Sequence, residues 1–252
     1  MIKKLSFAFV FAALTFAAPA LSEAAEDLSS YNAMYRSEQY EEAYRGYAAA
    51  LAKDRRNPGL WYNAGNALFR LNRLGDAVYA YSNAFMLSPR NSDIRFNLEY
   101  AMRLTGQTFV PEGTPKALYL LFYLLSEYEL KALLILLFWL GMSAAILAIC
   151  LKGKARSYAK NAAIAVAAAF VLCGGWAWAR SYAQFSTDAA VVTSGGGIKL
   201  LSGPGENFRE CAAAPEGRIV RILSSSDDNY YEIGLDAEGI SGWALKSGVK
   251  RI

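Results

Sequence analysis

Two stretches of about 19 residues without a charged side chain constrain this chain more than any other feature. They cover residues 133–151 and 161–179. Each is close to the roughly 20 apolar residues that an α-helix needs to cross the hydrocarbon core of a bilayer. The whole chain is 54% hydrophobic, which is high for a soluble protein. We therefore expect a multidomain membrane protein with two transmembrane helices.

The short loop between these stretches, residues 152–160, predicts their orientation. It contains no acidic residue and four basic ones, Lys152, Lys154, Arg156 and Lys160. Under the positive-inside rule, such a loop lies in the cytoplasm. Two spans then return the chain to the side from which it came, so the parts before and after the spans share one side of the membrane.

The N-terminus predicts the same side. Residues 1–25 contain the basic start, the apolar run and the small residues of a secretory signal. Cleavage after Ala20 and cleavage after Ala24 both fit, and an uncleaved anchor helix is the alternative. Together the two arguments predict a protein of the bacterial inner (cytoplasmic) membrane, with both flanking parts in the periplasm.

Residues 116–131 are apolar and aromatic but are interrupted by Glu127 and Glu129. Each of these charges would cost at least ~2.5 kcal/mol at the centre of a bilayer. We therefore expect this segment to be an interfacial helix that leads into the first span. A flexible linker is the alternative.

The region before the spans matches itself after a shift of 34 residues. The shift places Tyr47 on Tyr81 and Ala50 on Ala84. A period near 34 with two short helices per unit is typical of the tetratricopeptide repeat, and we expect an all-α domain of such helical hairpins over residues 26–106. The residues expected to pack the repeat are Trp61, Gly65, Ala77, Ala84 and Pro89.

Gly65 is the least expected of these residues, because glycine within a helix costs about 1 kcal/mol relative to alanine. We expect it to let the two helices of its unit approach closely. The first unit has Tyr31 at the matching position, so its helices should splay more. At least three units are usually needed for an isolated stack. We therefore expect this domain to lean on a partner, on the membrane-proximal helix or on a second copy of itself.

Polar residues on the first helix of each unit also recur at this spacing. In such stacks the first helices line the concave side. Amides can hydrogen-bond the backbone of an extended peptide, and arginines can pair with carboxylates. We hypothesise a groove for an acidic or C-terminal segment of a partner protein, and ordinary solvated positions on a duplicated unit are the alternative. The candidate residues are Asn32, Arg36, Asn63, Asn66, Arg70 and Asn97.

The composition argues against other classes of site. The chain has no histidine, the commonest metal ligand and the commonest general base. Its three cysteines, Cys150, Cys173 and Cys211, show no metal-binding or disulfide-framework spacing. The net charge of +4 is mild and forms no basic tract, so nucleic acid is not an expected partner. We predict no catalytic residue, no metal and no cofactor.

Six short runs of β-forming residues separated by turn residues fill the C-terminal region, residues 187–252. They predict a small all-β barrel. The turn segments Ser202-Gly203-Pro204, Glu216-Gly217 and Gly242-Trp243 resemble those of the bacterial SH3 domain, although Tyr230 stands where a tryptophan is common. Some relatives in that family bind cell-wall peptides or glycan, but the resemblance identifies no ligand-binding residue in this chain. We expect Trp243 to lie in the core.

The whole order of segments resembles the BatE-type proteins of the bacterial aerotolerance (Bat) operon, and residues 91–106 are especially similar to that family. The resemblance implies a scaffold without enzymatic activity, encoded with von Willebrand A-type membrane proteins and a MoxR-type ATPase. It also implies a role in aerotolerance or envelope stress.

We therefore expect an adaptor that is anchored by its two spans and binds other envelope proteins through the repeat groove. Von Willebrand A-type Bat proteins are the partners that the resemblance implies. The alternatives are a cell-wall-binding accessory protein, with the barrel contacting peptidoglycan, or an enzyme of the envelope. A transport role is disfavoured because neither span carries a charge.

Overall fold

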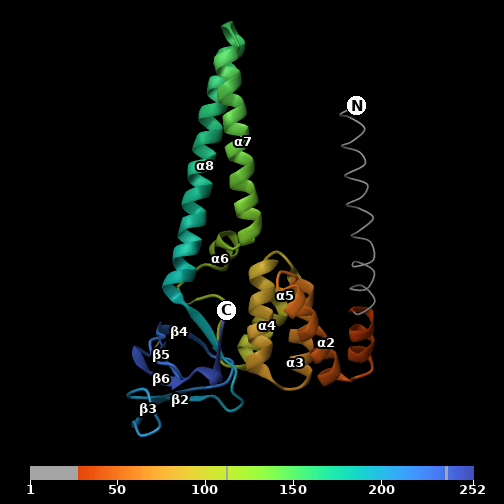
Figure 1. The fold of residues 1–252 in the computed structure, drawn as a ribbon, viewed down its shortest axis with the longest axis vertical. Helices are drawn as coiled ribbons and strands as arrows, with labels where there is room; N and C mark the ends of the chain where they lie inside the picture. The colour runs from red at the N-terminus through yellow and green to blue at the C-terminus, as the bar shows by residue number, and fades with distance from the viewer. Residues whose placement is uncertain (1–27, 112, 236–237) are drawn as a thin grey trace.

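The computed structural model describes residues 28–111, 113–235 and 238–252, except for the side chains of residues 184–187. The predicted signal, residues 1–25, lies outside this part. The described chain is a mixture of helices and one antiparallel sheet (Figure 1). Two of its helices form a long hairpin that rises from a body in which the other helices and the sheet lie side by side.

The helical part of the body begins with a helix over residues 28–36. It continues with α2 (Tyr40–Lys53), α3 (Pro58–Arg70), α4 (Leu74–Leu87) and α5 (Ser92–Leu104). The side chains of Asn57 and Asn91 cap α3 and α5 by accepting hydrogen bonds from the backbone of the first turn. Glu38 and Asn72 adopt a left-handed backbone at matching turns. Each pair is 34 positions apart, so the sequence repeat is also a repeat of backbone geometry.

Glycines make room for tyrosines inside both helical units. A Cβ atom on Gly65 of α3 would lie 2.6 Å from the ring of Tyr81 on α4. In the first unit the roles are exchanged, because a Cβ on Gly46 of α2 would lie 2.2 Å from the ring of Tyr31. Tyr31, which was expected to splay these helices, therefore has a glycine of its own to pack against. The other expected packing residues, Trp61, Ala77, Ala84 and Pro89, are buried.

The segments around the apolar stretches differ in their bounds from the sequence expectation. The single helix expected over residues 116–131 is divided into α6 (Lys116–Phe122) and the start of α7 (Glu127–Cys150). Ser126 and Glu129 form a capping box that begins the second helix there. The loop expected over residues 152–160 is also mostly helical, because α8 (Gly153–Thr187) begins almost directly after α7.

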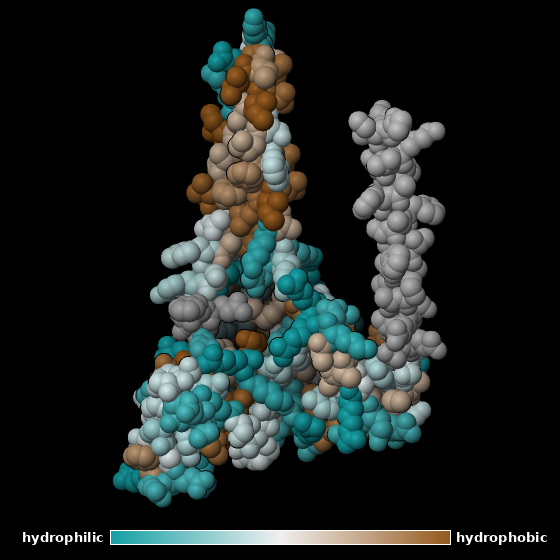
Figure 2. Space-filling model, viewed as in Figure 1, coloured by the Kyte–Doolittle hydropathy of each residue, from teal (hydrophilic) through white to brown (hydrophobic). Residues whose placement is uncertain are grey.

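The hairpin of α7 and α8 exposes its apolar side chains instead of burying them. Both helices are long and apolar enough to cross a membrane, and almost none of the residues in their most apolar stretches is buried. Figure 2 shows the apolar surface running along the hairpin, with hydrophilic residues at its tip. At about 1.5 Å per residue, the 24 residues of α7 extend about 36 Å, which exceeds the ~30 Å hydrocarbon core.

The C-terminal part forms a seven-stranded antiparallel sheet in the order β3-β2-β6-β5-β4-β1-β7. The sequence runs predicted six of these strands and missed β3. The strands are β1 (Ala189–Val192), β2 (Ile198–Leu201), β3 (Glu210–Ala214), β4 (Ile219–Ser224), β5 (Tyr230–Leu235), β6 (Ile240–Leu245) and β7 (Val249–Arg251). The side chain of Trp243, which was expected in the core, is only partly buried.

The sheet docks on the start of α4. The Glu216 carboxylate accepts a hydrogen bond of 2.8 Å from the backbone N–H of Gly75, in the first turn of that helix. The residue at the N-cap, Arg73, makes no side-chain cap of its own. A negative charge at this position also interacts favourably with the helix dipole. The sheet therefore supplies the cap that α4 lacks.

The side chain of Gln107, which follows α5, forms two hydrogen bonds to the backbone of the sheet domain at the same interface. Its amide nitrogen donates to the carbonyl oxygen of Gly217 (2.6 Å), and its amide oxygen accepts from the backbone N–H of Ile219 (2.8 Å). The helical domain thus leans on its own C-terminal sheet. The sequence had suggested a partner, the membrane-proximal helix or a second copy for this role.

A buried carboxylate completes the docking surface. Asp76 is only 6% exposed and lies between two cations. Arg73 donates to one of its oxygens (2.7 Å), and Lys250 of β7 donates to the other (2.7 Å). Charge-assisted hydrogen bonds therefore satisfy both oxygens of this buried carboxylate.

Substitution of Gly75 by alanine should loosen this docking. The new Cβ would lie 2.4 Å from the carbonyl oxygen of Val192, so α4 must move away from β1. Overpacking of this kind costs roughly 1–3 kcal/mol. We expect several-fold faster hydrogen exchange at the backbone amides of Gly217 and Ile219, measured by mass spectrometry on the full chain in micelles. The control is Gly174→Ala in α8, where a Cβ meets no atom within 4 Å. Unchanged exchange in Gly75→Ala would contradict the docking described here.

Candidate functional site

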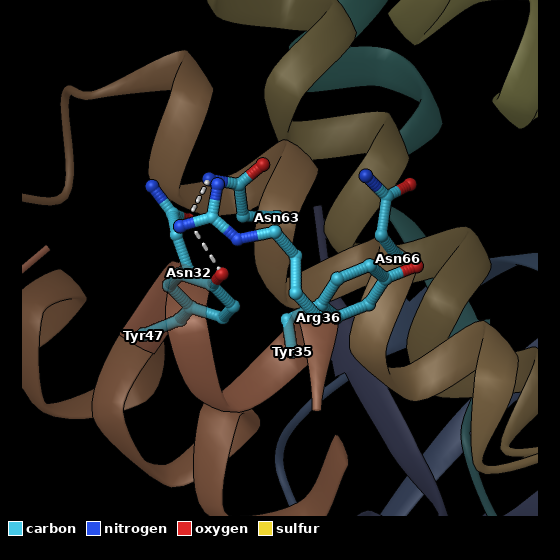
Figure 3. A pocket seen from close by; sticks show the side chains of 6 residues that line it. All are labelled: Asn32, Tyr35, Arg36, Tyr47, Asn63 and Asn66. Carbon is cyan, nitrogen blue, oxygen red and sulfur yellow. Dashed lines mark hydrogen bonds between the residues drawn. The ribbon is translucent and has the colours of Figure 1, made fainter. Parts of the chain in front are cut away.

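A cavity of about 230 Å³ opens between the first three helices, on the face formed by the helix over residues 28–36, α2 and α3 (Figure 3). Its lining is polar and aromatic, with Asn32, Tyr35, Arg36, Tyr47, Asn63 and Asn66. In Figure 3 the guanidinium of Arg36 reaches toward the amides of Asn32 and Asn63, while the Tyr35 ring points toward Asn66. The first helix and the third therefore contribute the amides, and Arg36 spans the space between them.

The asparagines form a ladder that repeats with the sequence. The Asn32 amide oxygen accepts from the hydroxyl of Tyr47 (2.7 Å) and from the amide of Asn63 (3.3 Å). One unit later, the Asn66 oxygen accepts from Tyr81 (2.8 Å) and from Asn97 (2.9 Å). These two oxygens therefore hold adjacent helices together and are not free to bind a ligand.

Four of the six predicted groove residues line this cavity, namely Asn32, Arg36, Asn63 and Asn66. Asn97 reaches the cavity only through its hydrogen bond to Asn66. Arg70 lies outside the lining, with its guanidinium 4.6 Å from the centre of the Tyr40 ring. Four of the predicted groove residues thus lie together around the cavity, whereas Arg70 packs over an aromatic ring.

Arg36 is the charged group that remains available in this cavity. Its side chain is exposed, and within the described part of the chain it forms no ion pair with a carboxylate. The amide nitrogens of Asn32 and Asn66 likewise make no hydrogen bond to another described residue. One cation with neighbouring amide donors suits a carboxylate ligand.

Two tyrosines of the lining were missed as site residues. Burial raises the pKa of Tyr47 to about 12, and burial also raises the pKa of Tyr35. Both hydroxyls therefore remain protonated at neutral pH. The match of Tyr47 with Tyr81 in the sequence was a signal for this site, although it was used only as evidence of the 34-residue repeat.

The size of the cavity limits what it can bind. Pockets for small molecules usually measure about 300–1,000 Å³. A space of about 230 Å³ suits a single side chain or a terminal carboxylate better than a cofactor. Among the described residues, no cluster of histidine, cysteine or acidic side chains is arranged to hold a metal ion.

Comparison with known proteins adds no relative to this description. No protein-family model matches the chain, and no curated protein is similar to it. The described chain has a body of helical hairpins and an antiparallel sheet, and an exposed apolar hairpin is joined to it. The helical part of the body contains a small cavity lined by one cation, Arg36.

Alkaline pH should destabilise the helical domain through Tyr47. Because its pKa is raised from 10.0 to about 12, the unfolded chain loses this proton near pH 10 while the folded chain keeps it. The contribution of Tyr47 to the free energy of unfolding is complete below about pH 10 and falls as the pH rises toward 12. We expect Tyr47→Phe to flatten this fall.

The measurement is the thermal unfolding of the full chain in micelles between pH 7 and pH 11.5. At pH 7 the variant should also lose about 1 kcal/mol, because the hydrogen bond to Asn32 is gone. Tyr158→Phe is the matched control, since Tyr158 is exposed on α8. An equal alkaline slope in Tyr47→Phe and in the unsubstituted chain would contradict the assignment.

Proposed function

We propose that this protein is a non-enzymatic, membrane-anchored adaptor of the bacterial envelope. In this proposal the helical hairpins are tetratricopeptide units and the sheet is an SH3-like barrel. Helices α7 and α8 cross the inner membrane, and the cavity around Arg36 binds a segment of another envelope protein. The resemblance to BatE-type proteins supports this proposal and suggests von Willebrand A-type membrane proteins as partners.

The observation that carries the proposal is the docking of the sheet on α4. Glu216 contacts Gly75 across 141 positions of sequence, and both apolar helices lie between them in the chain. Two parts in direct contact must lie on the same side of a membrane. An even number of spans between them satisfies this condition, so the docking supports a hairpin that enters the bilayer and returns.

The ends of the hairpin support the orientation. Basic residues at the tip favour the cytoplasm under the positive-inside rule. Near the other end of α8, Trp178 and Tyr182 are 69% and 61% exposed, and their rings stack with centroids 5.6 Å apart. Exposed aromatic side chains are typical of the boundary between hydrocarbon and water. The body then lies in the periplasm.

The hairpin is joined firmly to the body, which suits an adaptor. The indole N–H of Trp176 on α8 donates to the carbonyl oxygen of Phe122 at the end of α6 (3.1 Å). Arg90, which follows α4, forms an ion pair with Glu129 in the first turn of α7. A partner bound by the body would therefore be held at a fixed distance from the membrane.

Cysteine labelling tests the orientation. Cys211 is exposed on the sheet. Arg45, whose side chain is 74% exposed on α2, can be replaced by cysteine to report on the helical domain. In a chain carrying Cys150→Ala and Cys173→Ala, we expect a membrane-impermeant maleimide to label Cys211 in spheroplasts. After Cys211→Ala is added, it should likewise label an Arg45→Cys chain.

The reporter for the tip is Lys154→Cys in the chain without native cysteines. It should react only after the cells are lysed. Opposite accessibility of the sheet and the helical domain would rule out the proposed orientation, because the two could not then be in contact.

Partner capture tests the cavity. Asn66 is unsuitable for substitution because its oxygen holds Tyr81 and Asn97 in place. Arg36→Gln removes the available charge and leaves the ladder intact. We expect this variant to lose most, roughly ten-fold or more, of the proteins crosslinked to the full chain in membranes, as quantified by mass spectrometry. Arg45→Gln is the control, since that exposed arginine lies outside the cavity. Equal recovery by both variants, or recovery of wall fragments alone, would contradict the proposed adaptor site.

A further inference from the structure

A second and larger cavity, about 790 Å³ in volume, lies where the helical domain, the base of the hairpin and the sheet meet. Side chains from α4, α5, α6, α8, β1, β4 and β5 contribute to its lining. Its volume falls in the range of ligand-binding pockets, about 300–1,000 Å³. The proposed adaptor function makes no use of this cavity.

Aromatic rings form much of the apolar wall of this cavity. The ring of Phe85 on α4 lies 5.3 Å from that of Phe109 and 5.8 Å from that of Tyr123, between centroids. Tyr119 of α6 continues the cluster, 5.3 Å from Phe109. Burial raises the pKa values of both tyrosines, so their rings carry no charge at neutral pH. This wall suits a hydrocarbon chain.

The charged residues of the lining come from α8 and from the sheet domain. Among the described residues, the lining includes three arginines, Arg180, Arg218 and Arg221, and one acidic residue, Asp188. Arg218 pairs with Glu238 at 2.7 Å. Arg180 donates to the carbonyl oxygen of Leu125, and its guanidinium lies 5.2 Å from the centre of the Tyr123 ring. An excess of cations beside an apolar wall favours an amphiphile with a negative head group.

The position of the cavity indicates where such a ligand comes from. Arg180 and Ser181 lie on α8 directly after the apolar stretch of residues 161–179, and both line the cavity. Tyr119 and Tyr123 belong to the short segment that precedes α7. The cavity therefore begins where the hairpin leaves the hydrocarbon and extends into the body as far as Met102 of α5.

We propose that this cavity binds an anionic amphiphile with a fatty acyl chain, drawn from the membrane. The acyl chain lies against the Phe85, Phe109 and Tyr119 rings, and the negative head group lies among the arginines of the lining. The proposal rests on the membrane placement of α7 and α8 but is independent of partner binding at Arg36. A lipid bound here would contact all three parts of the molecule at once.

Native mass spectrometry of the full chain in dodecyl maltoside micelles tests this proposal. The ligands are palmitate, phosphatidylglycerol and the zwitterionic phosphatidylcholine, each added over a range of concentrations. We expect one molecule of an anionic ligand per chain, with phosphatidylcholine bound at least ten-fold more weakly. Binding of palmitate alone identifies a free fatty acid as the source, and binding of phosphatidylglycerol identifies a membrane phospholipid.

Variants assign the binding to this cavity. Thr108 is an exposed loop residue that lines it, so Thr108→Trp should fill it and weaken binding at least ten-fold. Thr114→Trp makes the same change in the same loop, at a residue outside the lining, and should have no effect. Arg221→Gln should weaken the binding of anionic ligands about five-fold, whereas Arg221→Lys retains it. Arg209→Gln is the control for a charge lost elsewhere on the sheet domain.

Three outcomes would overturn the proposal. They are equal binding of all three ligands, binding that Thr108→Trp leaves unchanged, and occupancy by detergent only. None of these outcomes bears on the cysteine-labelling pattern or on the capture of proteins by Arg36. Failure of the lipid site is therefore distinguishable from failure of the adaptor function.

Discussion

The contact between Glu216 and the first turn of α4 is the constraint on which the rest of this structure depends. Without it, the backbone N–H of Gly75 lacks its partner, because Arg73 makes no side-chain cap. With it, the sheet, the buried Asp76 and the bridging Gln107 join two parts that are separated in the chain by the whole hairpin. The larger of the two cavities lies along the same junction.

The sequence repeat and the long apolar runs made much of the fold predictable. The 34-residue repeat predicted the helical pairs, and hydropathy predicted both long apolar helices. Their ends were less predictable, for physical reasons. The loop expected over residues 152–160 is helical because lysine, arginine and alanine are good helix formers, whatever their charge. The helix expected over residues 116–131 is interrupted because Ser126 forms a cap, which hydropathy does not detect.

The candidate site was only partly predictable. Recurrence at 34 positions found Asn32 and Asn66, but it could not show that Tyr47 and Tyr81 occupy their oxygens. The domain junction was not predictable at all. Glu216-Gly217 was noticed as a turn typical of a small barrel, and nothing in the sequence linked it to Gly75. Contacts between distant positions leave no periodic trace, so only the folded chain shows that this turn faces a helix.

The distance in sequence between Glu216 and Gly75 has a consequence for biogenesis. Domains usually fold in order as the chain emerges, so the helical part is complete before the sheet has been synthesised. In the proposed topology, the first turn of α4 waits without its cap until 141 further residues have been made and the second apolar helix has returned the chain across the bilayer. If that helix inserted in the wrong direction, the turn would stay uncapped. The contact between Glu216 and Gly75 would thus form only in a correctly inserted molecule, before any partner is met.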